Sequence, residues 1–102
     1  MKTEFLAAAE AELAEAVAYY NEQSEGLCYE FAAEVKLTLA RIIQFPDAWA
    51  KLSPRTRRCR TKRFPYGLVY QVRGDLLLIV AVMHLRRHPD FWKSRLGLSG
   101  AG

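Results

Sequence analysis

The sequence predicts a small α+β fold in which an antiparallel sheet packs on a helical hairpin. Residues 7–44 carry apolar side chains at helical spacing, with one short break between two amphipathic runs. Residues 58–82 change to the two-residue period of strands. A chain of 102 residues has room for one core, so we expect one domain over residues 1–102.

The first half of the chain is predicted to be mainly helical. Residues 2–6 are expected to form a short first strand. Residues 7–23 are rich in Ala, Glu and Leu, which are strong helix formers, and Leu13 and Tyr20 fall on one apolar face. Residues 24–26, Ser-Glu-Gly, break this pattern and can turn the chain.

The second amphipathic run predicts a helix over residues 27–44. Its apolar stripe recurs at steps of three and four residues, and Pro46 ends it because proline disfavours helical geometry in the preceding residue. Two helices joined by so short a link should lie antiparallel as a hairpin. Residues 47–54 are expected to be a loop.

The second half predicts three strands. In residues 58–63, Arg58, Arg60 and Lys62 alternate with the other side chains and should share one face of a strand. Residues 76–82 are apolar on both faces, which is typical of a central strand. The other expected elements are a turn at 64–67, a strand at 68–72, a hairpin turn at Gly74–Asp75, a short helix or turn at 89–96 and a loose tail at 98–102.

The predicted order is therefore β-α-α-β-β-β followed by a short C-terminal helix or tail. The two helices are expected to cover one face of the sheet. The other face is expected to remain partly open and basic.

Charge is distributed unevenly along the chain. Residues 1–50 hold nine acidic and three basic side chains, whereas residues 51–102 hold two acidic and twelve basic ones. Seven Lys and Arg residues lie between Lys51 and Arg63 with no carboxylate among them. This pattern favours nucleic acid or an acidic protein segment as the partner. The structural alternative is a solvated face that keeps the protein soluble.

Other sequence signals exclude several classes of protein. Cys28 and Cys59 fit no metal or redox spacing, so we expect free thiols in a reducing cytoplasm, no metal and no cofactor. The N-terminus lacks the apolar run of a signal peptide. Residues 76–83, the longest apolar run, are too few to span a bilayer, so we expect no membrane partner.

Two segments resemble a known family, the RelE/ParE toxins of type II toxin–antitoxin modules, which include plasmid stabilisation proteins. Residues 63–70 read RFPYGLVY, and residues 81–92 read AVMHLRRHPDFW. A first helix that ends in Tyr19-Tyr20, followed by Gly26-Leu27 at the start of a second, also fits. The resemblance covers residues 2 to about 96.

The resemblance implies a toxin that stops growth until an antitoxin wraps it. RelE-like members cut messenger RNA inside the ribosome without a metal ion, and ParE-like members poison DNA gyrase. Ribosome-dependent cleavage is the leading expectation, and gyrase inhibition is its alternative. A non-enzymatic nucleic-acid-binding module is the alternative outside the toxins.

Metal-free cleavage of RNA needs a base, an acid and cations around one phosphate. Histidines can exchange protons near neutral pH, and arginines can hold phosphate oxygens. The catalytic candidates near the end of the last strand are His84, Arg86, Arg87 and His88. The candidates for nucleic-acid binding are Arg58, Arg60, Lys62, Arg63 and Arg73. We expect adjacent strands to bring both groups to one open face.

The same residues also have structural explanations. His84 can hydrogen-bond within the fold, and His88 before Pro89 can be a turn residue. Arg86 and Arg87 can bind an antitoxin or a nearby carboxylate. The resemblance implies a tyrosine near the C-terminus of RNA-cleaving members, where this chain has Phe91, which has no proton to give.

Overall fold

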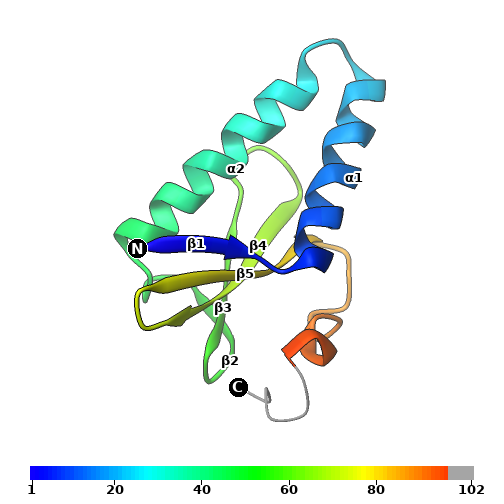
Figure 1. The fold of residues 1–102 in the computed structure, drawn as a ribbon. Coiled ribbons are helices and arrows are strands. Elements are labelled where there is room, and N and C mark those ends of the chain that lie inside the picture. The colour runs from blue at the N-terminus through cyan, green and yellow to red at the C-terminus, as the bar shows by residue number, and fades with distance from the viewer. Residues whose placement is uncertain (97–102) are drawn as a thin grey trace.

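The computed structural model describes residues 1–96, which form a five-stranded mixed sheet with a helical hairpin on one side (Figure 1). The strand order is β1-β5-β4-β3-β2, in which β1 runs parallel to β5 and the other neighbours are antiparallel. The elements are β1 (Lys2–Phe5), α1 (Ala7–Gln23), α2 (Leu27–Gln44), β2 (Ala50–Ser53), β3 (Thr56–Arg60), β4 (Tyr66–Arg73), β5 (Leu76–His84) and a 3-10 helix (Lys93–Leu96).

The predicted α+β class and the helical hairpin are confirmed, and both helices begin and end where the sequence predicts. Gly26 separates the helices with a φ of 80°, a left-handed conformation that other residues adopt only with strain. The predicted turn at Gly74–Asp75 joins β4 to β5, and Gly74 also has a positive φ. The first strand is confirmed as an edge strand, paired with the start of β5.

The helices cover one face of the sheet and form the larger of two cores with it. Four aromatic rings meet at its centre, with centroids 4.9–5.2 Å apart for Tyr20 and Phe31, Tyr20 and Phe64, and Phe31 and Tyr66. Such tilted and edge-to-face contacts add to the free energy gained by burial. Leu68, Tyr70, Leu77, Ile79 and Val82 contribute the sheet side of this core.

Three predictions about the strands are wrong. The expected loop at 47–54 contains β2, so the sheet has an additional edge strand. The strand that contains Arg58 ends at Arg60, which leaves Lys62 in the turn that follows. The sheet is not purely antiparallel, because β1 is parallel to β5.

The turn after β3 is fixed by hydrogen bonds from within the core. Glu34, buried on α2, accepts the backbone N–H groups of Lys62 at 2.5 Å and of Arg63 at 3.3 Å. Thr61 donates its hydroxyl to the Phe64 carbonyl at 2.6 Å. These bonds end β3 at Arg60 because they direct the backbone toward α2.

A β-bulge in β5 sets which face each side chain occupies. Val69 pairs with Ala81 and Tyr70 pairs with Ile79, so Val80 is an extra residue on β5. Val80 and Ala81 therefore both face away from the helices, and Val82 returns to the helical side. Without the bulge, His84 would lie on the opposite face of the sheet.

The face away from the helices is covered along part of its width. A second core forms there over β4 and β5, and the segment after β5 covers it with Trp92. Trp92 is completely buried and donates its indole N–H to the Pro89 carbonyl. The predicted short helix or turn at 89–96 is confirmed by the 3-10 helix. Arg58 and Arg60 of β3 also lie on this face, and the exposed Arg73 lies on it at the far end of β4.

The tail expected at 98–102 lies outside the described residues. Among residues 1–96, no helix is both long and apolar enough to cross a membrane.

Candidate functional site

Arg58 and Arg60 lie next to each other on the sheet face that points away from the helices. Arg58 pairs with Val69 of the second core, and Arg60 pairs with Gly67. The side chain of Arg58 crosses Gly67 so closely that a Cβ at residue 67 would be 2.9 Å from the Cγ and Cδ atoms of Arg58. Glycine at 67 therefore provides the space in which Arg58 is held.

The guanidinium of Arg58 also lies in an unfavourable electrostatic environment for a residue of a surface strand. Its Nε is buried without a hydrogen-bond partner, and so is the indole Nε1 of Trp49. Burial, followed by repulsion from Arg60, lowers the pKa of the Arg58 guanidinium. Trp49, Ala50, Arg58 and Arg60 line a cavity of about 370 Å³. Unpartnered donors beside a cavity are a feature of sites that bind an acceptor.

The other predicted nucleic-acid contacts lie elsewhere. Lys62 and Arg63 are in the turn held by Glu34, and Arg63 forms an exposed ion pair with Glu30 at 2.8 Å. Arg73 is at the far end of β4 and donates to the Gln71 amide oxygen at 2.8 and 3.0 Å. The predicted basic row is thus reduced to Arg58 and Arg60.

His84 faces the helices, because the bulge in β5 turns it to that side. Its ring contacts Tyr66 edge-on with centroids 5.2 Å apart. Its Nδ1 accepts the Arg86 backbone N–H at 3.1 Å, so one ring nitrogen already has a partner. His84 lines a cavity of about 200 Å³, whose other lining residues are Glu12, Glu15, Ala16, Tyr19, Tyr66, Val82 and Arg87.

Of the remaining catalytic candidates, Arg87 lines the same cavity as His84, whereas Arg86 and His88 do not. Arg86 is exposed, and His88 is exposed with its Nδ1 accepting the Asp90 backbone N–H at 3.1 Å. Arg87 places its guanidinium carbon 4.0 Å from the centre of the Phe91 ring and contacts Glu12 at 3.9 Å. Phe91 therefore serves as a platform for a cation at the position where the resemblance implies a tyrosine.

The structure does not bring the two predicted groups together. His84 lies on the helical face, whereas Arg58 and Arg60 lie on the opposite face. The sheet itself separates them. No group of three or more His, Cys, Asp or Glu side chains within residues 1–96 could hold a metal ion.

Sequence reasoning missed a second basic surface, on the helical side of β2 and β3. Lys51 and Arg57 are directly opposite each other, and with Tyr70 they line a cavity of about 200 Å³ below the end of α2. The run of seven cations from Lys51 to Arg63 was the available signal. It could not assign faces, because β2 was expected to be a loop.

Tyr70 makes the stability of this region sensitive to alkaline pH. Burial raises its pKa to about 12, and its hydroxyl donates to the Pro46 carbonyl at 2.5 Å. The unfolded chain releases this proton near pH 10. The contribution of the protonated Tyr70 hydroxyl to the free energy of unfolding is therefore complete below about pH 10 and is lost as the pH rises toward 12.

We expect Tyr70→Phe to remove part of this pH dependence. Wild type should lose about 1–2 kcal/mol more than the variant between about pH 9 and pH 11, measured by urea denaturation at both values. Tyr20 and Tyr66, whose pKa values are also raised by burial, contribute equally to both proteins and cancel. An equal change in the free energy of unfolding of the two proteins between these pH values would contradict the assignment of this pH dependence to Tyr70.

The fold defines the chain as a small α+β domain in which a helical hairpin covers one face of a mixed sheet. One solved structure that it matches, described as the chromosomal ParDE TA system from P. aeruginosa, superposes with a TM-score of 0.68 at 17% identity. The match covers 82% of this chain and 95% of that chain. No curated protein sequence matches the chain.

The family follows from the sequence itself. The sequence model described as the ParE toxin of the type II toxin–antitoxin system, parDE, matches residues 3–89. The chain belongs to the ParE toxin family. The resemblance to RelE/ParE toxins is thereby confirmed, and the family implies an antitoxin as partner.

Proposed function

We propose that this toxin stops growth in the cytoplasm by inhibiting DNA gyrase, and that it does not cut messenger RNA. One observation carries the proposal: His84 and the Arg58–Arg60 pair occupy opposite faces of the sheet. General acid–base cleavage requires its proton-transfer groups within hydrogen-bond reach of the phosphate that the cations hold. Groups separated by a sheet cannot act on the same phosphate.

The C-terminal segment supports the same proposal. Arg87 and Phe91 pack against each other, and Phe91 cannot donate a proton. A toxin that acts by binding needs a rigid surface and no proton transfer. The antitoxin would then silence it by covering that surface.

Cleavage of messenger RNA, our leading expectation from the sequence, is the second candidate. It is favoured by the unpartnered Nε of Arg58 beside the cavity that Arg60 also lines. An RNA phosphate could supply the missing acceptor there. Such a site would still lack His84, which lies on the helical face of the sheet.

A paired assay separates the two. Purified toxin is incubated with DNA gyrase and relaxed plasmid to measure supercoiling, and with translating ribosomes to map transcript ends by primer extension. We expect loss of supercoiling and intact transcripts. The variant His84→Asn, whose amide oxygen can replace the Nδ1 acceptor, should retain inhibition within about threefold, since no catalytic proton is lost.

Codon-positioned cuts that fall about a hundredfold or more in rate with His84→Asn would establish the nuclease instead. If induced expression causes no growth arrest, the binding module outside the toxins replaces both candidates.

A further inference from the structure

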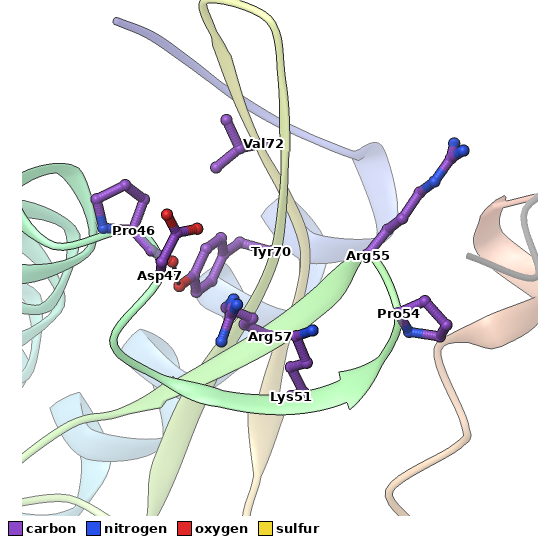
Figure 2. A pocket seen from close by; sticks show the side chains of 8 residues that line it. All are labelled: Pro46, Asp47, Lys51, Pro54, Arg55, Arg57, Tyr70 and Val72. Atoms are coloured by element: carbon purple, nitrogen blue, oxygen red, sulfur yellow. Dashed lines mark hydrogen bonds between the residues drawn. The ribbon is translucent and has the colours of Figure 1, made fainter.

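We propose that the cavity between the end of α2 and the β2–β3 hairpin, which we call the α2-end pocket, binds an acidic peptide segment of the antitoxin that also carries apolar side chains. The pocket is lined by Pro46, Asp47, Lys51, Pro54, Arg55, Arg57, Tyr70 and Val72 (Figure 2). The inference rests on the antitoxin partnership of the family. It does not depend on whether gyrase is the target.

The arrangement of the cations in the pocket favours the binding of an anion. Lys51 and Arg57 are direct cross-strand partners, and like charges in that position destabilise a sheet. No carboxylate in residues 1–96 forms an ion pair with Lys51, Arg55 or Arg57. A bound carboxylate between Lys51 and Arg57 would relieve their repulsion.

The guanidinium of Arg57 is held in place before any partner arrives. One of its terminal nitrogens donates to the Trp49 carbonyl at 2.8 Å. The other donors of its planar fork remain available to a carboxylate. Arg55 extends away from this pair at the rim, where it can meet a second acidic side chain (Figure 2).

Beside its cations the pocket also has apolar groups, from Pro46, Pro54 and Val72, which an apolar side chain of a peptide could cover. The Tyr70 ring is fixed by its hydrogen bond to Pro46, and Val72 is 41% exposed beside it. Phe45, the residue before Pro46, is 55% exposed. A leucine or phenylalanine next to an acidic residue could cover the exposed Val72 side chain, whereas a phosphate backbone has no apolar group to place there.

Asp47 is the single carboxylate that lines the pocket, so the three cations still leave it with a net positive charge. It lies on the Pro46 side, away from Arg55 (Figure 2). An acidic side chain is therefore repelled at one end of the pocket and attracted at the other. This asymmetry would orient the peptide along the hairpin.

The test measures binding of two fluorescent probes by anisotropy. One is a short peptide in which glutamate alternates with leucine, and the other is an oligodeoxythymidine with the same number of negative charges. The pocket variant is Lys51→Gln/Arg55→Gln, since neither side chain has a hydrogen-bond or ion-pair partner in residues 1–96 that folding could require. The control variant, Lys2→Gln/Lys36→Gln, removes two exposed charges outside the pocket.

We expect the peptide to bind wild type, to bind the pocket variant about tenfold more weakly, and to bind the control variant as it binds wild type. Affinity should fall with added salt. Equal weakening in both variants, no binding of the peptide to wild type, or pocket-dependent binding of the oligonucleotide that equals the peptide's would overturn the proposal.

Growth arrest separates this inference from the proposed function. The pocket variant should remain toxic when expressed alone, because the pocket serves the silencing partner. Loss of toxicity together with loss of peptide binding would assign the pocket to the target and overturn the inference. Normal peptide binding by a toxin that leaves gyrase unaffected would instead refute only the proposed function.

Discussion

Trp92→Ala is expected to lower the free energy of unfolding by about 3–5 kcal/mol, as for other fully buried large-to-small substitutions. Trp92 has no exposed surface and is the largest side chain of the second core. Its removal would leave a cavity over β4 and β5. The Pro89 carbonyl would also lose the hydrogen bond that it accepts from the indole N–H of Trp92. Guanidinium denaturation followed by circular dichroism measures the loss.

A conservative variant keeps this prediction interpretable. Trp92→Phe retains most of the apolar volume and should cost clearly less than Trp92→Ala. Tyr29→Ala, at a side chain that is 77% exposed, should stay within about 0.5 kcal/mol of wild type. A cost below about 1 kcal/mol for Trp92→Ala would mean that the segment after β5 is not part of the core.

The helical half could be predicted residue by residue because its signals are local. Apolar spacing, Gly26 between the helices and Pro46 after the second helix each fix a boundary without tertiary information. The turn at Gly74 is equally local. These features depend on the backbone conformations that single residues allow, so the residue types in the sequence are enough to predict them.

The strands were harder because their limits depend on long-range contacts. Nothing near Arg60 in the sequence indicates that Glu34 of α2 will accept the backbone N–H groups of Lys62 and Arg63 and so end β3. β2 is an edge strand of four residues, Ala-Lys-Leu-Ser, and its alternation of apolar and polar side chains is too short to predict a strand. The position of Trp92 in the second core likewise depends on the path of the segment after β5.

The candidate site failed to assemble as expected because of one extra residue. The register of β4 and β5 is set by the turn at Gly74, and strict alternation from Leu78 would put His84 on the face of Val69 and Arg58. The bulge at Val80 moves it to the other face. A run of apolar residues gives no sign of such a bulge, so sequence alone predicts the residue types of the site but not their faces.

The last of the large effects concerns Glu12, which joins α1 to the C-terminal segment. β1 ends at Phe5, opposite Ile79, and leaves the following edge of β5 uncovered. Glu12 accepts the Val82 backbone N–H at 3.1 Å, and Arg95 donates to the Val80 carbonyl at 3.1 Å. These two side chains protect the edge that β1 does not reach.

Glu12 and Arg95 also bind each other through two parallel hydrogen bonds of 2.7 and 2.8 Å. Their side chains are 13% and 19% exposed, and the bonds to Glu12 raise the pKa of the Arg95 guanidinium. We expect Glu12→Ala to cost about 2–3 kcal/mol, slightly less than for a fully buried pair, because it leaves Arg95 without its partner and the Val82 N–H without an acceptor.

Glu15→Ala is the matched control, because Glu15 lies on the same helix, is exposed, and forms no ion pair within residues 1–96. It should change stability by less than about 0.5 kcal/mol. A double-mutant cycle with Arg95→Met, which keeps an apolar stem, should give a coupling energy of about 1–3 kcal/mol. Amide exchange at Val82 should also accelerate in Glu12→Ala beyond what its lower global stability explains. The prediction would be contradicted by a coupling energy near zero together with unchanged protection of the Val82 amide. In that case packing alone would stabilise the edge of β5, and the Glu12–Arg95 ion pair would contribute nothing to it.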